Sequence, residues 1–191
     1  MKTFVITGSS RGIGNGLARR FLERGHQVMV SGSSSASTDK AFGELSEFED
    51  RVAGHPCDVT EHDQVQALWD RTTERFGRID VWINNAGINA AQQPFWEIPV
   101  GELQDIVNVD LMGVVFGCRV AMRGMIAQGD GHIYNMEGFG SGNEQRAGLT
   151  LYGATKRAVR YLSKAMLKDV GELPVKVSTL SPGIVVTDFL L

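Results

Sequence analysis

The stretch Thr3-Phe4-Val5-Ile6-Thr7-Gly8-Ser9-Ser10-Arg11-Gly12-Ile13-Gly14 decides the fold of this chain. Its apolar start indicates a buried strand, and beyond the glycines apolar side chains recur at helical spacing as far as Leu22. A strand, a glycine-rich turn and a helix start form a cradle for phosphate, because the glycines let the backbone approach and the first helical amides face the anion. The alternative is an ordinary tight turn, but the flanking strand and helix favour a dinucleotide site.

The alternation that this stretch begins continues along the chain. Apolar runs predict strands at 3–6, 27–30, 51–57, 79–83, 132–136 and 175–180. Helical spacing predicts helices at 13–24, 42–48, 60–76, 103–128 and 150–169. Strands that alternate with helices of this length form βαβ units with right-handed crossovers. We therefore predict an α/β fold, a doubly wound parallel sheet (Rossmann fold) with strand order 3-2-1-4-5-6 and helices on both faces.

Three local features refine this prediction. Residues 60–63 read as a capping box that starts the third helix. The serine-rich stretch 32–40 is predicted to be a mobile surface connection, and residues 89–101 a loop.

Length and composition limit the classes of function. A chain of 191 residues fits one domain, 1–191, and a net charge of -3 without a basic run gives no reason to expect nucleic acid. No apolar stretch is long enough to span a membrane, so the chain reads as a soluble protein of the cytoplasm or another intracellular compartment. Cys57 and Cys118 are expected to be reduced core thiols. The four histidines lack ligand spacing, and we predict no metal site.

The end of the second strand bears on the choice of cofactor. An acidic residue there would hold the adenosine ribose of NAD and repel the 2'-phosphate of NADP. The sequence instead reads Ser31-Gly32-Ser33-Ser34-Ser35, with no carboxylate. Arg11 in the glycine-rich turn could reach a phosphate, although it could also be a solvated loop cation. These residues favour NADPH over NAD(H).

Tyr152 and Lys156 are four residues apart, so on a helix they share one face. A phenol titrates near ~10 and is a poor acid–base group at neutral pH unless a cation favours its charged form. The alternative is a solvated pair. Asn108 lies inside a predicted helix, where an Asn is mildly unfavourable, so a purely structural reading needs some justification.

With these pieces in place, the whole chain resembles the short-chain dehydrogenase/reductase family. The resemblance rests on residues 7–14, Asp58-Val59, Asn84-Asn85-Ala86-Gly87, Val107-Asn108-Val109, Tyr152 with Lys156, and Pro182-Gly183 with Thr187. It implies that Tyr152 is the general acid, that Lys156 lowers its pKa and holds the nicotinamide ribose, and that Asn108 positions a water. The cofactor-binding residues that we expect on this basis are Gly8, Ser10, Arg11, Gly12, Ile13, Gly14, Ser31, Ser33, Asp58, Val59, Asn85, Ala86, Gly87, Tyr152, Lys156, Pro182, Gly183 and Thr187.

One departure from the family concerns its catalytic serine. The family's serine pair falls on Glu137 and Gly138, and neither is a hydroxyl. Ser141 could swing in, or be a solvated loop residue, and a buried, protonated Glu137 could donate a hydrogen bond instead. Together with Trp82-Ile83-Asn84-Asn85-Ala86-Gly87 and Thr187-Asp188-Phe189-Leu190-Leu191, the run 133–142 is similar to the chlorophyll(ide) b reductase branch, which reduces a formyl group of the pigment to hydroxymethyl.

A second departure is length, because members of the family usually continue past the Pro-Gly segment with a substrate-covering helical segment and a seventh strand, and nothing follows Leu191 here. The chain is either trimmed or naturally short with an open site. The resemblance implies a homodimer or homotetramer built on residues 103–128 and 150–169. The predicted function is an NADPH-dependent reductase of a small-molecule carbonyl, with the pigment's formyl group as one substrate and no nucleic acid as partner. A general ketone, aldehyde or 3-oxoacyl reductase is the alternative within the family, and a catalytically silent NADP-binding sensor or scaffold is the alternative outside it.

Overall fold

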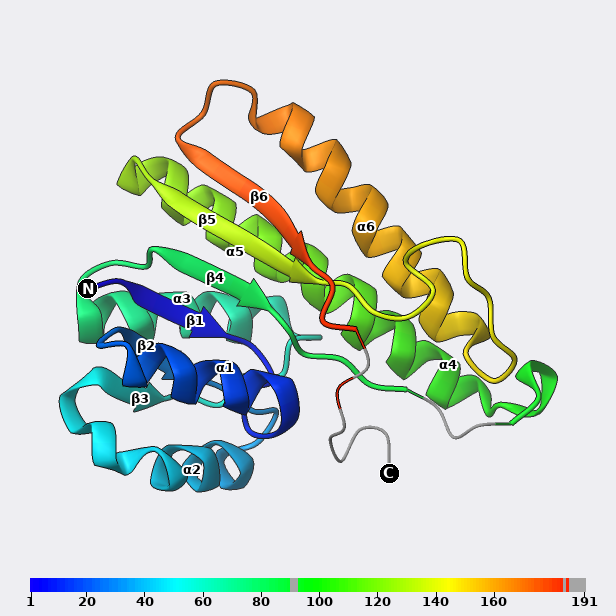
Figure 1. Cartoon of the computed structure of the whole chain (residues 1–191), viewed down its shortest axis with the longest axis horizontal. Coiled ribbons are helices and arrows are strands. Elements are labelled where there is room, and N and C mark those ends of the chain that lie inside the picture. Colours follow the sequence, from blue (N-terminus) through cyan, green and yellow to red (C-terminus); the bar gives the residue numbers. More distant parts are fainter. Residues whose placement is uncertain (90–92, 184, 186–191) are drawn as a thin grey trace.

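A computed structural model describes residues 1–89, 93–183 and 185 of the chain (Figure 1). Its strands form one sheet in the order β3-β2-β1-β4-β5-β6, and every neighbouring pair is parallel. The strands are β1 (Thr3–Ile6), β2 (Gln27–Val30), β3 (Val52–Gly54), β4 (Val81–Asn84), β5 (Gly131–Met136) and β6 (Val175–Leu180). The predicted doubly wound fold and its strand order are therefore confirmed. Within the described residues no seventh strand joins the sheet.

Helices cover both faces of this sheet (Figure 1). They are α1 (Gly12–Glu23), α2 (Ser35–Glu44), α3 (His62–Phe76), α4 (Val100–Val107), α5 (Gly113–Gln128) and α6 (Thr150–Val170), with short 3-10 turns at Ser46–Arg51 and Phe95–Glu97. Side chains of β1 alternate between two apolar cores. Phe4 and Ile6 belong to the core that α1 and α2 cover, whereas Val5 belongs to the one that α3, α5 and α6 cover.

The serine-rich stretch is a helix start, and our prediction of a surface connection is wrong there. Helix α2 begins at Ser35, and the Ser34 hydroxyl accepts a hydrogen bond from the Ser37 amide at 3.2 Å. The Ser37 hydroxyl in turn accepts one from the Ser34 amide, so two serines form a reciprocal capping box. Serine is a good helix cap as well as a loop residue, which is why composition alone misled us.

Two further boundaries differ from the prediction. Residues 60–63 form no capping box, because α3 starts at His62 after Glu61, whose side chain makes no capping hydrogen bond. The Thr60 hydroxyl donates to Asp58 instead, at 2.8 Å. The third strand ends at Gly54, three residues before the predicted end.

The predicted long helix begins earlier than expected and is interrupted. Residues Asn108–Met112 form a π-helical turn between α4 and α5, and α4 already begins at Val100, inside the predicted loop. A π turn takes one extra residue and re-aims the side chains around it, and such turns are frequent at functional sites.

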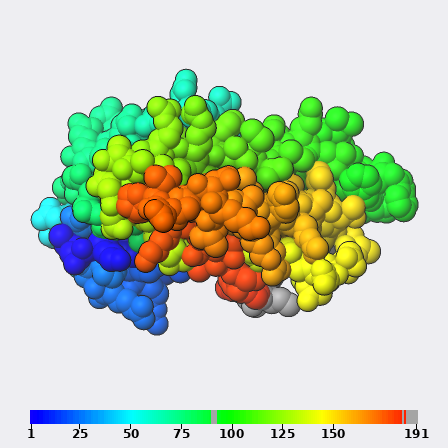
Figure 2. Space-filling model, turned by 90° about the horizontal axis from the view of Figure 1, so that it is seen from above, coloured from blue at the N-terminus to red at the C-terminus, as the bar shows by residue number. Residues whose placement is uncertain are grey.

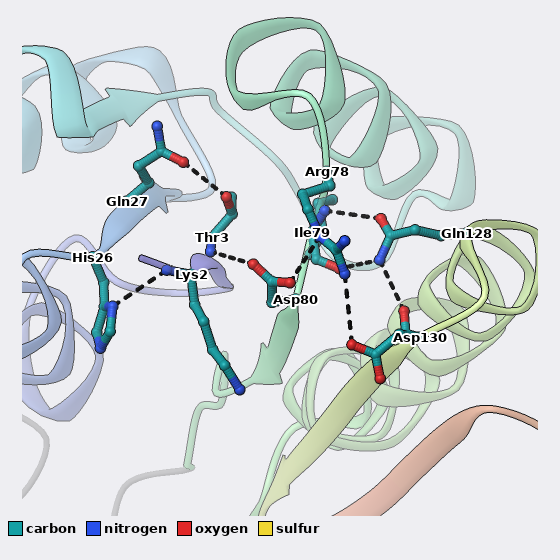
Figure 3. A network of polar contacts seen from close by, with 9 residues as sticks. All are labelled: Lys2, Thr3, His26, Gln27, Arg78, Ile79, Asp80, Gln128 and Asp130. Atoms are coloured by element: carbon teal, nitrogen blue, oxygen red, sulfur yellow. Dashed lines mark hydrogen bonds and ion pairs between the residues drawn. The ribbon is translucent and has the colours of Figure 1, made fainter.

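The amino ends of the central strands are tied together by polar contacts (Figure 3). The Asp80 carboxylate accepts from the Thr3 amide at 2.7 Å and pairs with the Arg78 guanidinium at 2.8 Å. Gln128, at the end of α5, exchanges two hydrogen bonds with the backbone of Ile79. These contacts join β1, β4 and α5 at the edge of the sheet opposite the glycine-rich turn.

Candidate active site

The glycine-rich turn leaves β1 at the carboxyl edge of the sheet and is held there by the segment after β4. The Asn85 side-chain amide donates to the carbonyls of Thr7 and Gly8, each at 3.0 Å, and the Thr7 hydroxyl accepts from the amides of Asn85 and Ala86. Gly8 has a φ of 62°, and a Cβ there would lie 2.7 Å from the Ala86 Cα. Only glycine satisfies both the positive φ and the close approach.

The start of α1 is open toward this turn. Its N-cap residue, Arg11, makes no side-chain capping hydrogen bond and is exposed, and no acidic residue lies in the first turn. Two buried polar atoms beside the turn, the Asn15 Nδ2 and the Ser31 Oγ, have no hydrogen-bond partner among the described residues. Free helix amides, unpaired polar atoms and a cradle that a Cβ would fill fit a bound dinucleotide phosphate.

The end of β2 and the segment after β3 complete this part of the site. Ser31 is buried and Ser33 is exposed, and the capped start of α2 follows them directly. Asp58 is half-buried, and its Oδ1 accepts from both the amide and the hydroxyl of Thr60. Val59 is buried against Gly113 of α5, where a Cβ would lie 2.7 Å from the Val59 side chain.

Tyr152 and Lys156 lie one turn apart on α6, as predicted. Lys156 is only 3% exposed, and its Nζ lies 5.4 Å from the centre of the Tyr152 ring. Burial, and secondarily the charge of Asp110, raise the pKa of Tyr152 to about 12. The net shift is therefore upward, because burial disfavours the phenolate and a carboxylate lies close by, and the expected lowering of this pKa by Lys156 stays a prediction.

The structure brings Asp110, and not Asn108, to Lys156. Asp110 is fully buried in the π turn, with its Oδ2 3.7 Å from the Lys156 Nζ. Asn108 is exposed and lines a surface cavity of about 320 Å³ with Leu151, the residue before Tyr152. Among the described residues Lys156 pairs with Asp110 and no ion pair or direct hydrogen bond joins it to Asn108, so the water-positioning role expected for Asn108 stays a prediction.

Gly87 joins the glycine-rich turn to the Tyr152–Lys156 pair. A Cβ at Gly87 would lie 3.3 Å from both the Asp110 Oδ1 and the Lys156 Nζ. The segment 85–87 thus contacts the turn after β1 at one end and the Lys156 ammonium at the other. The predicted phosphate cradle and the predicted acid–base pair belong to one continuous site at the carboxyl edge of the sheet.

The loop after β5 carries the remaining candidates. The Ser141 hydroxyl donates to the Glu137 carboxylate at 2.9 Å, and both side chains are buried. The Arg160 Nε lies 3.8 Å from the other oxygen of Glu137. The Glu137 carboxylate is thus an acceptor between a hydroxyl and a guanidinium, and the role of Ser141 or of a protonated Glu137 as second donor to the carbonyl oxygen stays a prediction.

Gly138 packs closely against the Tyr152 phenol. A Cβ at Gly138 would lie 2.3 Å from the Tyr152 hydroxyl oxygen, so the phenol occupies the space that a side chain would need. Figure 2 shows this loop, in yellow, against the first part of α6 on the surface. Pro182 and Gly183 follow the carboxyl end of β6, and Thr187 lies outside the described residues.

Sequence reasoning missed Asp110, although a signal was present. The residues buried along this helix, Ile106, Asp110, Val114 and Cys118, recur every four positions, so a charged side chain falls on an otherwise apolar stripe. Charged residues are almost never fully buried unless paired, and this position could have been singled out for that reason.

Within the described residues, no helix combines the length and the apolar character that a membrane span requires. The same residues contain no group of three or more His, Cys, Asp or Glu side chains that could hold a metal ion.

Comparison with known proteins gives a family and several relatives. The sequence profile of the family described as short chain dehydrogenase matches residues 2–190. A chloroplastic chlorophyll(ide) b reductase of Arabidopsis thaliana is 39% identical over 193 residues, a match that covers 98% of this chain and 56% of that protein. The chain thus spans about half the length of this relative.

Solved structures of a reductase and a dehydrogenase also resemble this chain. A 3-ketoacyl-(acyl-carrier-protein) reductase from Brucella melitensis, complexed with NADH, superposes with a TM-score of 0.91 at 27% identity, covering 99% of this chain and 78% of that one. The closed form of a serine dehydrogenase complexed with NADP+ gives 0.89 at 27% identity, with 98% and 75% covered. These neighbours hold either nicotinamide cofactor, so the likeness does not choose between NADH and NADPH.

Proposed function

Because this chain belongs to the short-chain dehydrogenase family, we propose that it is an oxidoreductase that reduces a carbonyl group with NADPH. The observation that carries the proposal is the continuity of the site. Segment 85–87 holds the glycine-rich turn at one end and lies against Lys156 at the other, next to the Tyr152 phenol. A dinucleotide bound on the turn would therefore extend toward a proton donor.

The preference for NADPH is supported by the charges at the end of β2. The residues directly after Val30, Ser31 to Ser35, include no carboxylate, and Arg11 is an exposed cation at the start of α1. A guanidinium binds phosphate in a bidentate manner, whereas an acidic residue would repel it. Ser33, also exposed, offers a hydroxyl at the same edge.

The acid–base part of the reaction falls to Tyr152. Bound NADPH would supply the hydride that forms the new C–H bond, leaving NADP⁺. The Tyr152 hydroxyl would give its proton to the substrate oxygen, and the resulting phenolate would regain a proton from solvent. With a pKa of about 12 this phenol is protonated at neutral pH, and a nearby cation that stabilises the phenolate would make it a stronger proton donor.

For the substrate, we propose a large planar aldehyde, the formyl group of chlorophyll(ide) b. The support is the plant relative's name, together with an apolar cavity of about 320 Å³ whose lining includes Leu151, the residue before Tyr152. Apolar side chains dominate its lining, and two aromatic residues near it, Phe95 and Trp96, are 45% and 83% exposed. A broad apolar ring system would cover side chains that are otherwise in water.

The test is NADPH oxidation in single turnover with a formyl-bearing chlorophyll derivative beside a small ketone and a 3-oxoacyl thioester. We expect the pigment to react faster than either control. A clear preference for the ketone or the thioester would leave a general carbonyl reductase. Binding of NADPH without turnover of any carbonyl would instead indicate a non-catalytic NADP-binding protein.

We further propose that two copies associate through the outer faces of α5 and α6. Ile126, Tyr161 and Leu167 are large apolar residues on these helices and are 38%, 76% and 55% exposed. Their burial in a dimer would remove apolar surface from water. Sedimentation that gives a monomer at micromolar concentration would contradict this arrangement.

A further inference from the structure

A second cavity, of about 330 Å³, lies between the loop after β5 and the exposed side of α6, and the proposed reaction does not use it. It is lined by Ser141, Gly142, Asn143, Arg157, Arg160, Tyr161 and Lys164. Three of these side chains are cations and none is a carboxylate, although the whole chain has a net charge of -3. A hollow lined by charges of one sign attracts a ligand of the opposite sign.

The cations come together because of their spacing on α6. Arg157, Arg160 and Lys164 follow one another at intervals of three and four residues, so they share one side of the helix. Like charges at this spacing destabilise a helix. A bound anion would offset that repulsion.

The two arginines are held in place by the loop that they face. The Arg157 Nη1 donates to the Gly142 carbonyl and, at 3.1 Å, to the Asn143 side chain. The Arg160 Nη1 donates to the Ser141 carbonyl at 3.3 Å. Each guanidinium has further N–H donors, and neither Nη2 group has an acceptor among the described residues. Both arginines are therefore fixed in position and keep donors for a ligand.

The remaining charges leave this cavity positive. Lys164 is exposed and has neither an ion pair nor a hydrogen bond in the described part of the chain. The Glu137 carboxylate, which pairs with Arg160 and accepts from Ser141, is buried behind the lining. Glu144 lies at the rim, where its Oε2 would be 3.2 Å from a Cβ at Gly142, but it is exposed and its charge is screened by water.

We propose that this cavity binds the phosphate group of a small anionic molecule through Arg157, Arg160 and Lys164. A phosphate presents oxygens in three directions and can accept from all three cations, whereas the two oxygens of a carboxylate match a single guanidinium fork. Tyr161, one wall of the cavity, belongs to the surface that we propose for the dimer, so the ligand would lie at the edge of that interface. The proposal goes beyond the proposed reduction and does not depend on it.

The loop connects this cavity with the proposed active site. Arg160 contacts Ser141 and Glu137, and Gly138, the next residue, packs against the Tyr152 phenol. Figure 1 and Figure 2 both show the loop, in yellow, alongside the first half of α6. A ligand that binds the two arginines from the solvent side is therefore placed to fix the loop against α6.

The experiment is a calorimetric titration of the full chain, without cofactor, with inorganic pyrophosphate at constant ionic strength. Lys164→Gln removes one cation of the site and breaks no contact in the described structure, so it should fold normally. Lys168→Gln is the matched control, because it removes the same charge from an exposed position one turn further along α6, outside the lining. Arg11→Ala controls for pyrophosphate that enters the glycine-rich turn.

We expect Lys164→Gln to weaken pyrophosphate binding about tenfold or more, because a charged hydrogen bond is lost. The binding component lost in this variant should remain unchanged in Lys168→Gln and in Arg11→Ala. Equal affinities of Lys164→Gln and the wild type, or equal losses in the two lysine variants, would overturn the proposal. Citrate that binds as tightly as pyrophosphate would contradict the assignment to phosphate.

Hydrogen exchange locates the ligand without any variant. Pyrophosphate should slow the exchange of amides in residues 138–149, because the loop would be held against α6 by the bound anion. Protection that is confined to residues 8–15 would place the anion on the glycine-rich turn and overturn the proposal.

Discussion

The contact between Gly138 and the Tyr152 phenol gives a sharp prediction, the effect of Gly138→Ala. The Cβ of the alanine would lie 2.3 Å from the hydroxyl oxygen, whereas ordinary van der Waals contact begins at 3.4 Å. The phenol must therefore retreat by about 1 Å. Gly138 has no positive φ, so the substitution brings no backbone strain that could confuse the result.

A shift of this size at the proton donor should be costly. Misplacing a reacting group by about 1 Å can lower the rate by ~10²-fold, because the near-attack geometry is lost. We therefore expect Gly138→Ala to lower kcat about a hundredfold. NADPH binding should change much less, since Gly138 has no contact with the glycine-rich turn in the described structure.

The assay is steady-state NADPH oxidation with the best carbonyl substrate, beside titration of nicotinamide fluorescence for binding. Gly142→Ala is the matched control, because it lies in the same loop and its nearest neighbour, at 3.2 Å, is the flexible end of Glu144. Full activity of Gly138→Ala would show that the phenol does not react from this position. Equal losses in both variants would point to a general disturbance of the loop.

Three further predictions address the cofactor, the loop and the sheet. Arg11→Ala should weaken NADPH binding by about tenfold more than NADH binding, because a charged hydrogen bond to phosphate is lost, and equal losses by fluorescence titration would contradict the assignment of Arg11. Ser141→Ala and Glu137→Gln break the same hydrogen bond, and at least one of them should lower kcat tenfold or more. The double variant should lose little kcat beyond the worse single variant. Additive losses in kcat would mean that the two residues have separate roles. Asp80→Ala should lower the free energy of unfolding in urea by about 1.5 to 3 kcal/mol, since Asp80 binds both the Thr3 amide and Arg78. Asp63→Ala, at an exposed position, should change this free energy very little. Similar values for the two variants would show that the contacts at the amino edge of the sheet contribute little.

Much of the fold followed from local patterns in the sequence. Apolar runs and helical spacing are set by neighbours in the chain, so the strands, the helices and the glycine-rich turn could be predicted, and their alternation indicated a doubly wound parallel sheet. The first and last residues of the elements were harder to predict, because they depend on capping contacts and local turns. Serines that cap α2 and serines in a loop look alike, and nothing local announces that residues 108–112 form a π turn.

Only those residues of the site that belong to a recognisable sequence motif could be predicted. Tyr152 and Lys156 lie one turn apart because helix geometry alone places them so. The four-residue spacing from Ile106 to Cys118 marks Asp110 as a buried position, but its pairing with Lys156 on another helix is a tertiary contact that the spacing does not show. The raised pKa of Tyr152 follows from burial and from this carboxylate, which are tertiary facts.

The central claim is that Tyr152 is the proton donor of a carbonyl reduction by NADPH, and the most direct test is single-turnover NADPH oxidation by the wild type and by Tyr152→Phe. Removal of one hydroxyl should leave NADPH binding intact, as nicotinamide fluorescence would report. We expect the rate of hydride transfer to the carbonyl to fall at least 10²-fold, the scale of a lost general acid. A Tyr152→Phe protein that binds NADPH and oxidises it at a rate within a few-fold of the wild type would contradict the account.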